Sequence, residues 1–140
     1  RAARERSAAE LNAYLDDLLV DLDLEPENMA IVGFSQGTML ALQVAPRRED
    51  AVAGVVGFSG RLLEPEMLAE EARVKMPVLL AHGDQDDLVP PQSLPDALRT
   101  LQGAGFEKVY GHVMQGTGHG IDPEGLSVAL AFLREQLGYE

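Results

Sequence analysis

The sequence predicts an α/β fold in which a mainly parallel sheet is covered by helices on both faces. Two observations carry this prediction: short apolar runs recur at wide intervals, and a helical pattern lies between successive runs. Parallel strands are joined by right-handed crossovers, which such helices supply. Since the chain has 140 residues, we expect a single domain.

The first segment predicts an amphipathic helix that packs by one face. Its apolar residues follow a 3.6-residue period, and they are Leu11, Tyr14, Leu15, Leu18, Leu19 and Leu22. Ser7 with Glu10 would form a capping box at the helix start, although the helix-forming residues before Ser7 would equally extend the helix upstream. Pro26 and the polar residues around it end the pattern.

Apolar runs predict strands over 29–34, 51–58, 77–82 and 106–114. The first three are almost continuously apolar, as in strands buried on both faces. Helical patterns lie at 36–45, 64–73 and 92–102. After the fourth run, Asp122 and Pro123 are suited to the N-cap and first position of a last amphipathic helix.

Composition excludes several functional classes. No apolar run approaches the ~20 residues of a membrane span. The net charge of −12, with 11 scattered basic residues, disfavours a nucleic-acid surface. Since cysteine is absent, disulfides, thiolate metal sites and a cysteine nucleophile are excluded. The first ten residues lack the apolar region of a secretory signal, so we expect a cytoplasmic protein.

Residues 33–37, with the sequence GFSQG, match the pattern G-x-S-x-G where a strand gives way to a helix. In that context Ser35 would be an exposed nucleophile at the carboxyl edge of the sheet, and the backbone N–H of Gln36 would be one oxyanion donor. Gly33 and Gly37 would permit the sharp turn, and we expect a side chain at either position to crowd it. The alternative is an ordinary glycine-rich turn.

The segment 82–90, with the sequence HGDQDDLVP, directly follows the third strand. Catalytic groups gather at the carboxyl ends of strands in open α/β sheets, and a carboxylate there would orient a histidine. Asp84, Asp86 and Asp87 compete for this role, and each could equally be a solvated loop residue. The residues alone leave the choice open.

The segment 116–120, with the sequence GTGHG, follows the fourth strand. Gly118 and Gly120 would let His119 approach a neighbouring loop, so His119 is the preferred base. His112 lies within a strand pattern and is interpreted as a surface or packing residue, and His82 as a brace for its own loop. The chain order of serine, aspartate and histidine is that of the α/β-hydrolases.

The segments GFSQG, HGDQDDLVP and GTGHG resemble three signatures of the phospholipase/carboxylesterase family of α/β-hydrolases, which includes acyl-protein thioesterases and relatives of dienelactone hydrolase. In the family pattern H-G-x-x-D-x-x-V-P the triad acid lies four residues after the histidine, so the resemblance selects Asp86. It implies ester or thioester hydrolysis through an acyl-enzyme, with no cofactor or metal.

The resemblance also implies that part of the domain is missing. Complete members have further strands upstream, including the loop that supplies the second oxyanion donor. We therefore expect the N-terminal strands to be missing, and residues 1–140 to be the carboxyl-terminal part of a single α/β-hydrolase domain. Leu62, Leu63 and Met67 are candidates for lining the acyl site, or else they bury one face of a helix.

These observations predict a serine carboxylesterase that acts on a small-molecule ester and binds no nucleic acid. An acyl-protein thioesterase or lysophospholipase is the alternative within the class. A catalytically idle fragment, binding a partner through an open sheet edge, is the alternative from another class. Assembly as a homodimer stays open.

Overall fold

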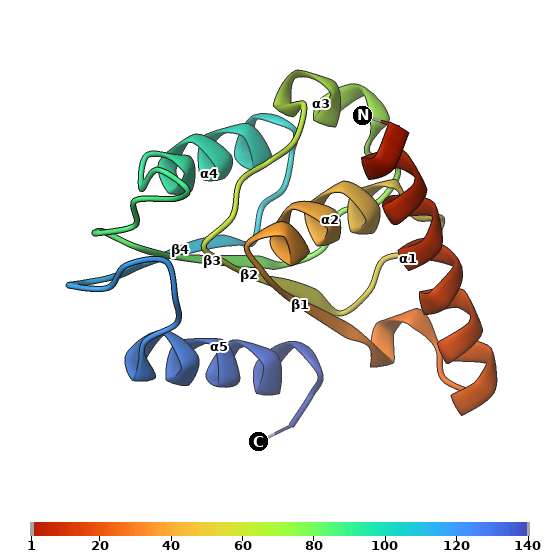
Figure 1. The fold of residues 1–140 in the computed structure, drawn as a ribbon. Helices are drawn as coiled ribbons and strands as arrows, with labels where there is room; N and C mark the ends of the chain where they lie inside the picture. The colour runs from red at the N-terminus through yellow and green to blue at the C-terminus, as the bar shows by residue number, and fades with distance from the viewer. Residues whose placement is uncertain (1, 140) are drawn as a thin grey trace.

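The computed structural model describes residues 2–139 (Figure 1). Its helices and strands are α1 (Ala2–Leu22), β1 (Ala30–Phe34), α2 (Gln36–Val44), β2 (Gly54–Phe58), α3 (Leu68–Glu71), β3 (Val78–Gly83), α4 (Ser93–Gly103), β4 (Val109–Met114) and α5 (Pro123–Gln136). Short 3₁₀ turns lie at Pro26–Asn28, Ala45–Arg47 and Pro65–Met67.

The strands form one parallel sheet in the order β1-β2-β3-β4. Helices α1, α2 and α4 lie on one side of the sheet and α5 lies on the other (Figure 1). This is the parallel α/β sheet, covered by helices on both faces, that the sequence predicted. Because all strands run the same way, the loops that come after them meet at one edge of the sheet.

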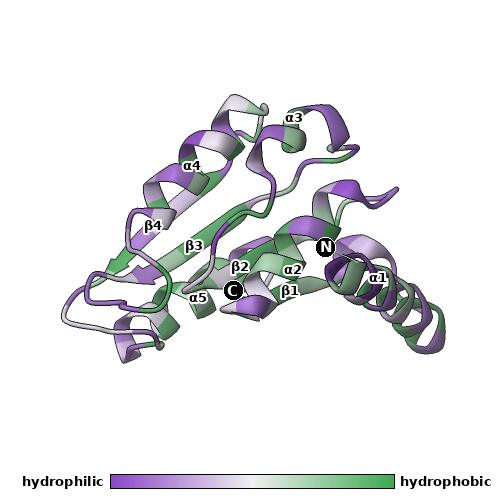
Figure 2. Ribbon diagram, turned by 45° about the horizontal axis from the view of Figure 1, so that its top comes forward, coloured by the Kyte–Doolittle hydropathy of each residue, from purple (hydrophilic) through white to green (hydrophobic). Residues whose placement is uncertain are grey.

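Two apolar cores hold these layers together. The larger lies between the sheet and helices α1, α2 and α4, and includes Leu15, Leu42 and Leu101. The smaller lies beneath α5 and includes Phe58 and Phe132. In Figure 2 the hydrophobic colouring is strongest on β1, β2 and β3, whereas the helices carry both hydrophobic and hydrophilic residues.

Strand burial agrees with the prediction for β2 and β3, which are buried along their whole lengths. The prediction for β1 is wrong, because its residues alternate and Val32 and Phe34 are 53% and 41% exposed. Both side chains lie on the α5 side of the sheet, where α5 packs over β2, β3 and β4. Because β1 is an edge strand that α5 does not cover, its face on the α5 side of the sheet is exposed.

Helix ends differ from expectation in two places. The capping box at Ser7 is wrong and the alternative of an upstream extension is confirmed, since α1 already includes Ala2 and Ser7 lies inside it. The stripe on α1 is only partly buried, because Tyr14 is 61% exposed. The helix expected over 64–73 is a 3₁₀ turn followed by the short α3. Asp122 caps α5 as predicted, accepting a hydrogen bond from the Gly125 N–H at 2.6 Å.

Candidate active site

Ser35 lies in the turn between β1 and α2, with φ 55° and ψ −114°. Positive φ is uncommon for a residue other than glycine, and a strained strand-to-helix turn is the geometry that exposes the serine of a G-x-S-x-G segment. The Ser35 N–H donates to the Phe58 carbonyl oxygen at 2.8 Å. The turn is therefore tied to the end of β2, and the Ser35 side chain stays partly exposed.

The two glycines of this turn differ. A Cβ on Gly33 would lie 2.5 Å from the carbonyl carbon of Gly37, so the close approach of strand and helix requires glycine there. A Cβ on Gly37 would meet nothing within 4 Å. The expectation that a side chain at Gly37 would crowd the turn is wrong, because an added Cβ there would lie in open space.

His119 joins the turn at Ser35 to the loop after β3. Its Nε2 lies 3.0 Å from Ser35 Oγ, and its Nδ1 lies 2.8 Å from Asp86 Oδ2. The Phe34 ring packs against the imidazole with centroids 5.0 Å apart. Three side chains from three separate loops thus form one hydrogen-bonded chain at the carboxyl edge of the sheet.

Asp86 is the aspartate that meets His119, and its side chain is fully buried. Its Oδ1 accepts hydrogen bonds from the N–H groups of Leu88 and Val89, each at 2.9 Å. Burial on its own raises the pKa of the Asp86 carboxyl, but the hydrogen bonds from His119, Val89 and Leu88 together hold the pKa below its usual value. Asp86 therefore stays ionised beside the imidazole.

The other two aspartates of the loop point elsewhere. Asp84 accepts a hydrogen bond from the Gly116 N–H at 2.8 Å, which ties the loop after β3 to the loop after β4. Asp87 is exposed. Within residues 2–139, the aspartate of this loop that accepts a hydrogen bond from His119 is Asp86.

The remaining histidines lie as the sequence suggested. His82 is buried and braces the loop after β3, with Nε2 2.9 Å from the Val89 carbonyl oxygen and 3.3 Å from Asp86 Oδ2. His112 lies on β4 with its side chain 18% exposed, and its Nε2 is 3.4 Å from a carboxylate oxygen of Glu124 on α5. His112 is thus a packing residue at the helix–sheet boundary.

The approach of the His119 loop to its neighbour depends on a glycine outside the segment 116–120. A Cβ on Gly120 would meet nothing within 4 Å, and one on Gly118 would make an ordinary contact. A Cβ on Gly83 would instead overlap the carbonyl oxygens of Thr117 and Gly118. Gly83, at the end of β3, therefore permits the close approach that was expected of Gly118 and Gly120.

Gln36 is the first residue of α2. The first N–H groups of a helix have no acceptor within that helix, and the N-terminal end carries partial positive charge. An oxyanion formed beside Ser35 would find both features at this helix start. The geometry suits the oxyanion role expected for the Gln36 N–H.

A hollow of about 370 Å³ lies beside Gln36, between α1, α2 and the segment after β2. Of the candidate acyl-site residues, Leu63 lines this hollow. Leu62 packs into the larger core, and Met67 is half-buried in the 3₁₀ turn. The alternative of core burial therefore describes Leu62, while Leu63 stays beside the site.

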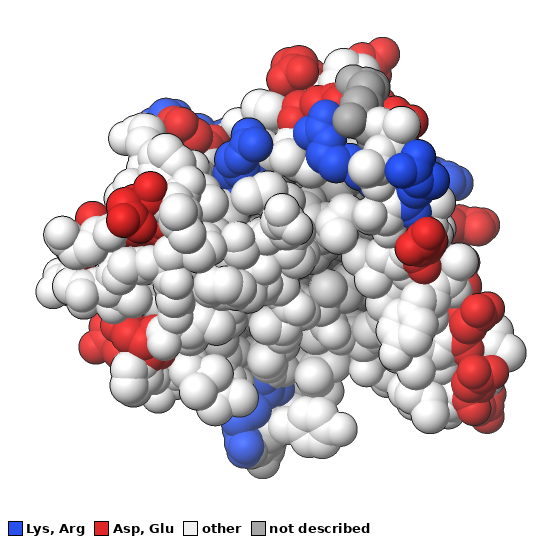
Figure 3. Space-filling view, in the orientation of Figure 1, with Lys and Arg blue, Asp and Glu red and all other residues white. Residues whose placement is uncertain are grey.

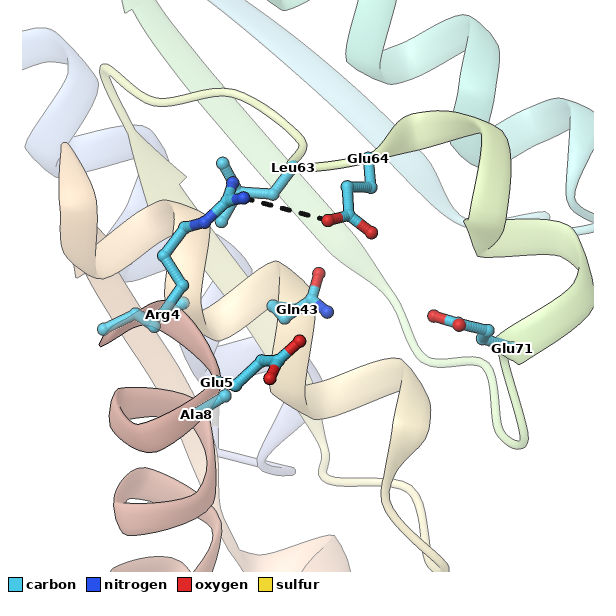
Figure 4. A pocket seen from close by; sticks show the side chains of 8 residues that line it. Arg4, Glu5, Ala8, Gln43, Leu63, Glu64 and Glu71 are labelled. Atoms are coloured by element: carbon cyan, nitrogen blue, oxygen red, sulfur yellow. Dashed lines mark ion pairs between the residues drawn. The ribbon is translucent and has the colours of Figure 1, made fainter. Parts of the chain in front are cut away.

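A second hollow, of about 240 Å³, is lined by charged side chains from α1 and the segment 63–71. Figure 4 shows Arg4 reaching Glu64, with 3.8 Å between their nearest charged atoms. Its lining includes none of the three hydrogen-bonded residues of the site. In Figure 3 charged side chains lie mainly around the margin of this face, and the middle is uncharged.

Within residues 2–139, no group of three or more His, Asp or Glu side chains converges as a metal site would require. None of the helices in the same range has the length and apolar composition needed to cross a bilayer.

A parallel sheet that carries serine, aspartate and histidine in this chain order at its carboxyl edge defines an α/β-hydrolase. Comparison with known families narrows this class, since the sequence profile of the phospholipase/carboxylesterase family matches residues 2–137. The chain belongs to the phospholipase/carboxylesterase family.

Individual relatives agree with the family. The chain is 31% identical to acyl-protein thioesterase 1 of Gibberella zeae over 123 residues, covering 84% of this chain and 52% of that protein. It is 30% identical to esterase YpfH of Escherichia coli over 105 residues, covering 75% of this chain and 44% of that protein. The chain thus spans about half the length of these curated relatives.

The chain is also similar to solved structures. The crystal structure of esterase PE8 is 42% identical, with a TM-score of 0.93, over 97% of this chain and 63% of that one. Arabidopsis thaliana SOBER1 shares the fold with a TM-score of 0.88 at 24% identity, over 97% of this chain and 65% of that one.

Proposed function

We propose that this protein is a serine carboxylesterase in which Ser35 is the nucleophile, His119 the general base and Asp86 the residue that orients the imidazole. The observation that carries the proposal is the chain of two hydrogen bonds, 3.0 Å from Ser35 Oγ to His119 Nε2 and 2.8 Å from His119 Nδ1 to Asp86 Oδ2. Geometry of this kind lets a neutral serine act as a nucleophile.

In the first half of the proposed reaction, Ser35 Oγ attacks the ester carbonyl carbon while His119 Nε2 takes the hydroxyl proton. The carbonyl oxygen becomes an oxyanion, which accepts a hydrogen bond from the Gln36 N–H. When the carbon–oxygen bond of the ester breaks, His119 returns the proton to the leaving alcohol. The acyl group remains covalently bound to Ser35.

In the second half, His119 takes a proton from a water molecule as the water oxygen attacks the acyl-enzyme. Collapse of the tetrahedral intermediate breaks the bond to Ser35 Oγ, and the proton returns to that oxygen. The carboxylic acid is released and Ser35 is restored. Asp86 stays ionised throughout and stabilises the imidazolium formed in each half.

Acyl-protein thioesterase activity is a second candidate, favoured by the relatives that carry that name. The 42% identical structure is named an esterase. The two activities use the same nucleophile and differ in the acyl group and in the leaving sulfur or oxygen. Rates measured against acyl length on matched oxygen and sulfur esters separate them, and a sharp optimum at short oxygen esters would reject the thioesterase.

We also propose that residues 1–140 form the carboxyl-terminal part of one α/β-hydrolase domain, with further strands pairing along β1. The partial coverage of the relatives supports this, as do the open edge of β1 and the exposed Val32 and Phe34. The mass of the polypeptide from its source tests the proposal, which predicts a value well above 15.1 kDa. We propose separately that the protein is cytoplasmic, and cell fractionation tests this location.

The second oxyanion donor would come from that additional part of the domain. Losing one such donor costs about 10²–10³ in kcat, so the 140-residue chain assayed alone is expected to be a slow esterase. A normal esterase rate from this chain alone would contradict the domain proposal. If the complete domain, with the additional strands present, also fails to hydrolyse esters, the result would favour the alternative of a catalytically idle binding module.

The decisive variant for the catalytic proposal is Ser35→Ala. It should abolish the burst of p-nitrophenol from a short-chain p-nitrophenyl ester and lower kcat by roughly 10⁶-fold. Ser127→Ala is the matched control, since Ser127 is exposed on α5 on the far side of the sheet from α2. Unchanged hydrolysis by Ser35→Ala would remove Ser35 from the mechanism.

A further inference from the structure

The turn after β2, residues 58–60, contacts the nucleophile turn. The Phe58 carbonyl oxygen accepts two hydrogen bonds of 2.8 Å, one from the Ser35 N–H and one from the Thr38 hydroxyl. Thr38 lies in the first turns of α2 and is buried. Both the serine and the start of its helix are therefore held by one carbonyl group at the end of β2.

The same turn also contacts the loop that carries His119. Ser59 Oγ donates a hydrogen bond of 2.9 Å to the carbonyl oxygen of Gly120, the residue after His119. Ser59 is completely buried, so water cannot replace this hydrogen bond without a rearrangement. One buried hydroxyl thus joins two segments that are 61 residues apart in the sequence.

The backbone at Ser59 is unfavourable for serine. Its φ is 55°, a region in which glycine is much easier to accommodate. Its N–H is already satisfied by the Ala81 carbonyl oxygen at 2.9 Å. The backbone geometry therefore does not explain why this residue is a serine. The Ser59 hydroxyl donates its hydrogen bond to the Gly120 carbonyl oxygen.

We infer that Ser59 is a positioning residue for the hydrolytic reaction. Its hydroxyl holds the Gly120 carbonyl, and through it the loop that keeps His119 Nε2 within reach of Ser35 Oγ. Together with the Phe58 carbonyl, which holds Ser35 itself, the turn at 58–60 sets the spacing of nucleophile and base from both sides. This inference rests on the proposed serine hydrolase function.

Two variants at Ser59 separate the effect of the hydroxyl group from the effect of the strained backbone. Ser59→Ala removes the hydroxyl and keeps the strained φ, whereas Ser59→Gly removes the hydroxyl and relieves the strain. Both leave the Gly120 carbonyl without this partner. We expect kcat to fall about tenfold or more in both, with KM little changed, since a lost neutral hydrogen bond has roughly this effect.

A spectroscopic measurement follows His119 directly. The imidazole proton between His119 Nδ1 and Asp86 Oδ2 should give a low-field ¹H NMR signal in the wild-type protein. This signal should broaden or disappear in Ser59→Gly, even where the melting temperature is unchanged. Ser59→Cys keeps the shape of the side chain with a weaker donor, and should lie between wild type and Ser59→Gly in both measurements.

The outcomes separate this inference from the proposed function. Labelling of the wild-type protein and of Ser127→Ala by a fluorophosphonate supports the hydrolase. If Ser59→Gly is then labelled and turns over ester as fast as the wild type, the positioning role is overturned and the hydrolase stands. If the wild type is not labelled, the hydrolase proposal fails. Separately, an NMR signal that persists unchanged in Ser59→Gly would overturn the role of Ser59 in positioning His119.

Discussion

Strands β1 and β2 both end in Gly-Phe, and each is followed by a serine with positive φ. The strands pair in register, with Gly33 opposite Gly57 and Phe34 opposite Phe58. Ser35 and Ser59 both have φ 55°, and each N–H donates to a carbonyl oxygen of the next strand. The hydroxyl groups nevertheless differ, because Ser35 faces an imidazole and is partly exposed, while Ser59 is buried against a carbonyl group.

The two turns differ in the features that would activate a serine hydroxyl. The segments after the two serines differ as well: Gln36 begins a helix of 9 residues, whereas Gly60 begins an irregular segment. A helix N-terminus favours developing negative charge, and a neighbouring base activates the hydroxyl. Ser35 has both features and Ser59 has neither, which supports the proposal that the same local sequence serves catalysis in one turn and positioning in the other.

After Ser35→Ala, the largest expected loss of activity comes from removing the carboxylate that is proposed to orient His119. Asp86→Asn should lower kcat about 10⁴-fold with the fold intact, because the amide cannot hold the imidazole in the productive tautomer. Steady-state ester hydrolysis measures this. Asp87→Asn, an exposed neighbour in the same loop, is the control and should behave as wild type. Equal losses in both variants would show that loop charge, and not the contact with His119, is responsible.

The glycines before the two serines offer the next test. A Cβ on Gly33 would meet backbone atoms of Gly37, whereas a Cβ on Gly57 would meet side-chain methyl groups of Thr38 and Leu80 at 2.5 and 2.9 Å. Gly33→Ala should destabilise the fold by about 3 kcal/mol or more, and Gly57→Ala by less, since side chains can move aside more easily. Urea unfolding measures both.

Gly37→Ala is the control for that pair and should leave stability nearly unchanged, because the position has open space. A Gly37→Ala variant as unstable as Gly33→Ala would mean that the Gly37 position is packed against other atoms and that the contrast between the two glycines is wrong.

A smaller effect is expected at Gly83, which permits the approach of the His119 loop. Gly83→Ala should displace Thr117 and the loop behind it and lower kcat roughly 100-fold, since a shift of about 1 Å in a catalytic group has this effect. Gly118→Ala, where the added Cβ makes an ordinary contact, should retain most activity. If Gly118→Ala instead loses more activity than Gly83→Ala, Gly118 would be the glycine that permits the approach of the His119 loop, as the sequence first suggested.

The smallest expected effect is on the pH dependence of stability. The pKa of Asp86 is lowered in the folded protein, so its contribution to stability is present above its unfolded pKa of about 3.9 and is lost as pH falls through the lower folded value. The free energy of unfolding, measured with urea, should therefore fall more steeply with decreasing pH below pH 5 in the wild type than in Asp86→Asn. Ser59→Gly should keep the wild-type slope, because no titrating group is removed.

The sequence predicted the loops of the site because parallel strands end at one edge. Ser35, Asp86 and His119 each come after a separate strand, so a correct strand assignment brings them together without any knowledge of side-chain packing. The choice of Asp86 did not follow from the residues, since three aspartates share that loop, and it required the family pattern. In the structure, the buried contact with His119 distinguishes Asp86 from the other two.

Other features depend on tertiary neighbours and could not be predicted from the sequence. β1 has an apolar sequence like β2, but its burial is set by where α5 packs. The need for glycine at Gly83 arises from the distant loop at Thr117 and Gly118. Ser59 did leave a signal, because residues 57–59 repeat the Gly-Phe-Ser of 33–35, yet its partner Gly120 is visible only in the fold.

The most direct test of Ser35 as the nucleophile is to locate a fluorophosphonate adduct by mass spectrometry of the digested wild-type protein. The two Gly-Phe-Ser turns provide an internal comparison within one sample. We predict that the adduct lies on Ser35 and that Ser59 is unmodified. An adduct on Ser59, or no adduct on Ser35 in the folded protein, would contradict the assignment of Ser35 as the nucleophile.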